Sequence, residues 1–233
     1  MNKILIDDNK TYFLEVKEQN KFEVFVKKNN EAKLVVYSNN IDYDLDINLA
    51  ANSHLIINSL NNNVNNNAVI NLLENSIIEY NYSIVSESNS INKIVVNHLN
   101  KNSKSIICNN GVNLDNNKLF FEIDGIIEKN ITNCEASQYS KIINYKDGNS
   151  KIIPNLIIDN NDVIANHSAY IGSFSKEDIF YIKSRGINER EMYKLLYRSL
   201  LLGKMKLDEE EELFNKLLKE WRVLWIEKIF QCY

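Results

Sequence analysis

Three histidines and three cysteines are the side chains of this sequence best suited to hold a transition metal. Neutral imidazole and thiolate are both good ligands for metals such as iron. The cysteines, Cys108, Cys134 and Cys232, are odd in number, widely spaced and without a CxxC pair. This pattern argues against a disulfide framework and against a self-contained zinc site, so we expect reduced thiols.

The densest acidic cluster outside the C-terminal quarter is Asp42, Asp44 and Asp46. Its alternation would place the three carboxylates on one face of a strand, and clustered acids on a sheet are typical of β-helical carbohydrate-active enzymes. No Lys or Arg is interleaved with them, which favours a solvated outer face. The chain also lacks the G-x-x-x-x-G-K-[ST] loop, so any nucleotide hydrolysis must come from a partner.

From Lys3 to about Tyr170 the sequence repeats one kind of unit, and this unit predicts the elements that would position these residues. Each unit is a short β-branched or aromatic run followed by a cluster of Asn, Asp, Ser or Lys; examples are 11–16, 22–26, 34–37, 55–57, 77–80, 94–96, 105–108, 119–123 and 156–158. Strands at this spacing indicate a sandwich, a barrel or a solenoid. The turns are rich in Asn, which tolerates left-handed backbone angles, and hairpin signals are scarce. These features favour a solenoid whose coils stack into one core.

Near Ser173 the periodicity becomes helical. Ser175 is a predicted N-cap followed by acids, and Gly186 a predicted C-cap. A second helix is expected from Met192 to a stop near Gly203, and a third over 208–230, whose acidic run 208–212 reads as a solvated first turn. We therefore expect a β region over 1–172 and a helical domain over 173–233.

Composition excludes several classes of function. The chain has 233 residues, a formal charge of −4 and a pI near 5.5, with no basic run longer than a pair, so nucleic acid is not an expected partner. The first apolar run is interrupted by Asp7 and Asp8, which does not fit a secretory signal. No apolar stretch approaches the ~20 residues that a membrane helix needs. We expect a cytoplasmic protein without a membrane partner.

The segment from Pro154 to Ile187 carries an ordered motif. It matches the pattern P-x-L-x-I, D-V, H-x-A-x-x-G and F-Y-x-x-S-R-G-I through Pro154, Leu156, Ile158, Asp162, Val163, His167, Ala169, Gly172, Phe180, Tyr181, Ser184, Arg185, Gly186 and Ile187. This motif resembles the SufB/SufD family of the SUF iron–sulfur cluster assembly system. Weaker similarity extends upstream through His98 and the step at Gly125, whereas the N-terminal helical region of longer members has no counterpart in the pattern.

The resemblance implies a right-handed parallel β-helix followed by a helical domain that docks the SufC-like ABC ATPase. Members dimerise through their β-helices, so the second partner would be a SufB-like subunit or another copy of this chain. The SufB branch has a cysteine and a glutamate at the positions of Tyr139 and Ser168, whereas the SufD branch keeps only the histidine, here His167. The chain thus resembles the SufD branch, with a transient iron–sulfur cluster at a subunit interface.

The resemblance also assigns site residues. His167 is the expected cluster ligand, and Cys134 is a candidate displaced thiolate, although free cysteines are commonly small buried hydrophobes. Cys108 is expected in the core and Cys232 to be incidental, while His54 and His98 have no support as ligands.

Four residues of the motif's second half are implied to face the ATPase: Phe180, Tyr181, Arg185 and Gly186. The structural alternative is that the aromatics seal the junction between the β-helix and the helices and that Arg185 caps carbonyls at a helix end. A β-helical carbohydrate-active enzyme or a purely structural β-solenoid remains the alternative to a non-enzymatic assembly subunit.

Overall fold

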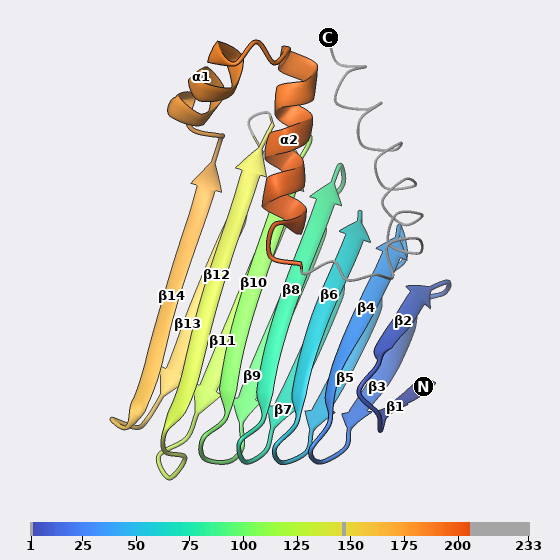
Figure 1. The fold of residues 1–233 in the computed structure, drawn as a ribbon, viewed down its shortest axis with the longest axis vertical. Helices are drawn as coiled ribbons and strands as arrows, with labels where there is room; N and C mark the ends of the chain where they lie inside the picture. The colour runs from blue at the N-terminus through green and yellow to red at the C-terminus, as the bar shows by residue number, and fades with distance from the viewer. Residues whose placement is uncertain (1, 146–147, 206–233) are drawn as a thin grey trace.

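The strands form a parallel β-solenoid in a computed structural model that describes residues 2–145 and 148–205 (Figure 1). One sheet contains the odd-numbered strands β1 (Asn2–Ile6), β3 (Asn20–Val26), β5 (Tyr43–Leu49), β7 (Asn66–Leu72), β9 (Ser90–His98), β11 (Leu119–Ile127) and β13 (Lys151–Ile158). The other contains the even-numbered strands β2 (Thr11–Val16), β4 (Glu31–Asn39), β6 (His54–Asn62), β8 (Ile77–Ser86), β10 (Lys104–Asn113), β12 (Cys134–Asn144) and β14 (Val163–Gly172).

Every pairing between neighbouring strands is parallel, and consecutive strands alternate between the two sheets. A sandwich of antiparallel sheets is therefore excluded, and the predicted solenoid is confirmed. Because side chains alternate between the faces of a strand, one residue in two points into the solenoid. The interior is filled by stacked aliphatic and aromatic side chains such as Leu34, Ile57, Tyr80 and Ile107.

Asparagine shapes one corner of the coils. Asn29, Asn52, Asn75, Asn102 and Asn133 all have positive φ, between 56° and 63°. From Asn52 onward, the Nδ2 of each member donates to the Oδ1 of the preceding one, over 2.7 to 3.1 Å. We call this column the asparagine ladder. The Asn-rich turns thus reflect both the tolerance of Asn for the left-handed region and its ability to bond to itself from coil to coil.

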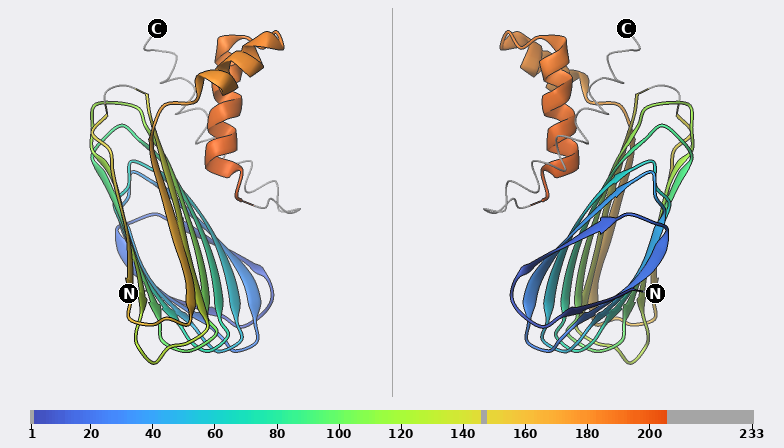
Figure 2. Two further views of the ribbon diagram at one scale, coloured as in Figure 1. Left: turned by 90° about the vertical axis from the view of Figure 1, so that its left-hand side faces the viewer. Right: turned by 90° about the vertical axis from the view of Figure 1, so that its right-hand side faces the viewer.

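The helices α1 (Lys176–Ser184) and α2 (Glu189–Leu202) follow β14 and lie on the side of the even-strand sheet (Figure 2). The Ser175 side chain accepts from the Asp178 N–H, as expected for an N-cap, and Gly186 has a φ of 76°. Buried side chains of α2, including Tyr197 and Leu201, pack on the outer face of the even-strand sheet, against residues such as Leu60. The third predicted helix and the acidic run lie outside the described residues.

Candidate functional site

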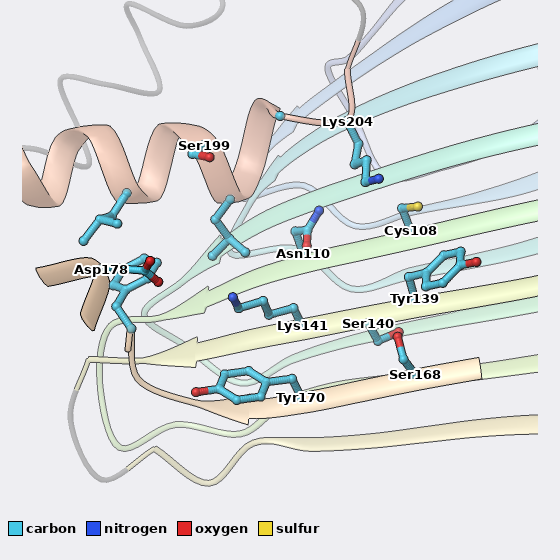
Figure 3. Close-up of a pocket in the computed structure, with 14 residues that line it drawn as sticks. Cys108, Asn110, Tyr139, Ser140, Lys141, Ser168, Tyr170, Asp178, Ser199 and Lys204 are labelled. Atoms are coloured by element: carbon cyan, nitrogen blue, oxygen red, sulfur yellow. The ribbon is translucent and has the colours of Figure 1, made fainter. Parts of the chain in front are cut away.

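Three side chains from neighbouring strands share one position on the outer face of the even-strand sheet. Cys108 in β10 is paired with Tyr139 in β12, and Tyr139 with Ser168 in β14. All three line a pocket of about 590 Å³ (Figure 3). Parallel neighbours lie about 4.8 Å apart, so the sheet sets these three groups in a row across the pocket.

The pocket is closed on one side by α2, through Leu196, Ser199 and Leu200, and by Gly203 and Lys204, which directly follow this helix. Lys141 and Tyr170 line the sheet side, with the Lys141 Nζ 5.1 Å from the centre of the Tyr170 ring. Asp178 of α1 adds a carboxylate. The lining therefore combines a thiol, two phenols and charges of both signs.

Cys108 is buried, as expected, but it faces outward beneath the pocket and not into the stacked interior. Burial raises the pKa of its thiol, while Lys204 opposes that rise. A thiol held in its protonated form is a poor metal ligand until a metal displaces its proton. Cys108 is nonetheless the described thiol that lies beside the Tyr139 position.

His167 is in β14, the last strand of its sheet, and faces the inner side of the solenoid. Its register partner Gln138 is 2% exposed. His167 itself is exposed, because no further strand of the described residues follows β14 in the sheet. The imidazole is therefore an interior residue at the open end of the solenoid.

Cys134 is placed apart from His167. It is paired with Val163, four positions before His167 in β14, which corresponds to about 13 Å along the strand. Its side chain is 1% exposed and lies 3.3 Å from the Ser103 Oγ. The coil thus keeps the two candidate ligands apart, and Cys134 lies among buried apolar neighbours.

The other two histidines have structural partners. The His98 ring lies between Ser103 Oγ and Ser105 Oγ, at 2.8 and 2.9 Å, and burial lowers its pKa to about 4. His54 contacts Glu31 through Nδ1 and Glu79 through Nε2, at 3.4 and 3.3 Å. The two carboxylates contact different ring nitrogens of His54. His54, Glu31 and Glu79 therefore do not form a binding site for one metal ion.

Within the part of the chain that the structure describes, no three His, Cys, Asp or Glu residues converge to hold a metal ion.

The acidic alternation is accounted for by hydrogen bonds. Asp42 accepts from the backbone N–H and side chain of Asn65, Asp44 from Asn67, and Asp46 pairs with Lys21 at 3.3 Å. These carboxylates link neighbouring coils through hydrogen bonds and an ion pair. Their arrangement does not favour the carbohydrate-active alternative.

The motif residues on α1 are strongly exposed. Phe180 is 75% and Tyr181 is 59% exposed, and no residue of α1 is buried. The Arg185 Nη2 donates to the Tyr181 hydroxyl at 2.8 Å, with the guanidinium 4.8 Å from the ring centre. Among the described residues, these exposed aromatics do not seal the junction, where Phe174 and Tyr197 make an edge contact with ring centres 5.0 Å apart.

The protein is thus a parallel β-solenoid with two helices beside its even-strand sheet (Figure 2). Its described residues form no self-contained metal centre. Residues 14–200 match the family model described as "SUF system FeS cluster assembly, SufBD core domain". That match covers most of the sequence, and the chain belongs to this SufB/SufD family.

One curated relative is the iron–sulfur cluster assembly protein SufD of Bacillus subtilis (strain 168), to which the chain is 30% identical over 105 residues. The matched stretch covers 45% of this chain and about a quarter (24%) of the relative. Among the described residues, no helix is long and apolar enough to cross a membrane.

Proposed function

We propose that this chain is a non-enzymatic, cytoplasmic subunit of a SUF-type assembly complex, in which His167 contributes one ligand to a transient iron–sulfur cluster at a subunit interface. The observation that carries the proposal is the position of His167 on the last, uncovered coil. A single imidazole exposed at the end of a solenoid is suited to share a site with a second subunit, because neutral imidazole binds iron through one nitrogen.

The end of the solenoid supports dimerisation. β13 and β14 are the terminal strands of their sheets, so each has one backbone edge without a neighbouring strand among the described residues. Such edges readily pair with another chain. Three large apolar side chains on these strands are also exposed: Ile157, Ile164 and Ile171, at 55%, 63% and 42%. The partner on this end would be a SufB-like subunit or a second copy of this chain.

The helical end supports docking of the ABC ATPase. Phe180 and Tyr181 present exposed aromatic surface in the part of the chain that the structure describes, and Arg185 is held beside Tyr181. Aromatic and Arg side chains are enriched among the residues that dominate binding energy at interfaces. Gly186 follows the C-cap of α1 and adopts the left-handed region, so it shapes the turn that separates this surface from α2.

The test is co-purification with a SufC-like ATPase and a SufB-like subunit, followed by assays of iron and acid-labile sulfide. We expect a stable complex that carries iron and sulfide, with ATP hydrolysis confined to the ATPase. A chain that binds neither subunit, or that hydrolyses ATP by itself, would contradict the proposal. The iron and sulfide contents of complexes with His167→Ala and with His54→Ala are then compared. Only His167→Ala should lower them, because His54 lies elsewhere on the same sheet.

A further inference from the structure

Gln138 carries a side-chain amide across the interior of the solenoid, one strand away from His167. It lies in β12, and its Nε2 donates to the backbone carbonyl of Asn155 in β13 at 3.0 Å. This bond fixes the orientation of the amide, because only the nitrogen end can donate to a carbonyl. The Oε1 atom is therefore directed away from Asn155.

Gly125 makes room for this amide. A Cβ atom at Gly125 would lie 3.1 Å from the Gln138 Nε2 and 3.2 Å from the Leu156 Cδ2. The absence of a side chain at this position of β11 thus allows the Gln138 side chain to reach the opposite sheet.

The Gln138 Oε1 is buried and has no hydrogen-bond partner among the described residues. Buried carbonyl groups of this kind are nearly always paired, because an unpaired one loses its bonds to water without replacement. The inward-facing positions around Gln138 are Ser105, Ile107 and Asn109 on β10, Ala136 and Ser140 on β12, and Ala165, His167 and Ala169 on β14. Among the side chains that can donate, Ser105 contacts His98, and Asn109 donates to Ser140. His167 is the direct register partner of Gln138, and its ring has no hydrogen-bond partner among the described residues.

We propose that Gln138 is a positioning residue for His167: its Oε1 accepts the N–H of one imidazole nitrogen and leaves the other nitrogen directed out of the open end. This inference rests on the proposed function of His167 as an iron ligand. Histidines that bind metals usually donate their second ring N–H to an acceptor that fixes tautomer and orientation. Strand neighbours about 4.8 Å apart are close enough for rotation of the exposed His167 side chain to make this bond.

Ring nitrogen chemical shifts test the inference in the full chain without iron. With ¹⁵N-labelled histidine at a pH where the ring is neutral, and with His167→Ala to assign its signals, we expect one dominant tautomer of His167. Gln138→Leu keeps the size of the side chain without the acceptor and should change the tautomer ratio at least threefold. Gly125→Ala should shift it in the same direction by displacing the amide.

Ser140→Ala is the matched control, because it removes a buried polar group two positions along β12 and should leave the ratio unchanged. A ratio that is the same in the wild type, Gln138→Leu and Gly125→Ala would overturn the positioning role, whatever the assembly assay gives. A changed ratio with normal cluster assembly would instead support the positioning role and count against His167 as a ligand. The two ideas can therefore fail separately.

Discussion

Cys108 and Tyr139 are direct neighbours in the register of two parallel strands, and both side chains line the same pocket. The SufB branch of the family, as the sequence motif implies, has a cysteine at the Tyr139 position. This chain has instead a buried thiol one strand away. A second thiol introduced at the Tyr139 position would therefore lie beside Cys108 in the same pocket.

Tyr139→Cys should create a two-thiolate site with Cys108. We expect Cd²⁺ to bind at least tenfold tighter than to the wild type, about 1.4 kcal/mol, because soft metals favour thiolates. Since burial raises the pKa of Cys108, Cd²⁺ must displace a proton and binding should tighten as pH rises. Thiolate-to-metal charge-transfer absorbance measures this. The double variant with Cys108→Ala should lose the gain; retention of tight binding there would exclude Cys108.

His167→Ala should fold normally, bind its partner subunits and lose iron–sulfur maturation. The side chain is exposed, so its removal leaves no large cavity and should change the free energy of unfolding by no more than about 0.5 kcal/mol. Iron and sulfide content of the purified complex, together with a denaturant titration, measure both effects. Wild-type maturation rates in this variant would remove His167 from the mechanism.

Arg185→Ala should weaken binding of the ATPase subunit about tenfold while leaving the melting temperature within a degree or two. The guanidinium contacts Tyr181 on a helix without buried residues, so the solenoid does not depend on it. Isothermal titration with the ATPase and a thermal melt provide the comparison. Lys176→Ala at the opposite end of α1 is the control. Equal losses in both variants would show that Arg185 has no specific role.

His98 predicts a dependence of stability on pH. Its folded pKa is lowered to about 4 from 6.5, so the unfolded chain binds the proton more tightly. Stability should therefore be complete above the unfolded pKa and fall as pH drops from about 6.5 to about 4, by on the order of 3 kcal/mol. Denaturant titrations over this range measure the slope. His98→Gln should be less stable at pH 7 but show a shallower slope; an unchanged slope would assign the effect to other groups.

Substitutions of Asn75, in the centre of the asparagine ladder, should lower the free energy of unfolding by different amounts. Asn75→Ala removes side-chain bonds to Asn52 and Asn102 and places Ala at a φ of 56°. It should cost about 2 to 4 kcal/mol, whereas Asn75→Gly tolerates the backbone and should cost about 1 kcal/mol less. Chemical denaturation separates the two. Equal costs would mean that the backbone conformation contributes little.

The fold was predictable because its determinants are local and repeated. Alternating apolar residues fix which side of a strand is buried, and the Asn-rich turns mark the corners, as Asn29 and Asn52 show. Ser175 marked the start of α1 in the same way, whereas the C-cap is Arg185, one position before the predicted Gly186, which has the positive φ. The ladder between asparagines was not predicted, since it requires knowing that residues 23 positions apart become neighbours.

The site was less predictable for the same reason. The motif located His167, but its neighbour Gln138 lies 29 positions earlier in the chain and carries no local pattern. Cys108 and Tyr139 are 31 positions apart, so their contact depends on coil length. Counting backwards from Tyr139 by one coil would have found Cys108, had the coil lengths been known. Cys134, close to Tyr139 in sequence, instead pairs with Val163, so it lies about 13 Å along the strand direction from His167.

The asparagine ladder also divides the solenoid into coils of defined length. Asn29, Asn52 and Asn75 repeat every 23 residues, so a segment such as 30–52 begins and ends at the same corner. In-frame deletion or duplication of that segment changes the length of the solenoid by one strand spacing, about 4.8 Å, and leaves the open end with His167 unaltered. The separation between the two ends can thus be varied in evolution by whole coils, without redesign of the chemistry at either end.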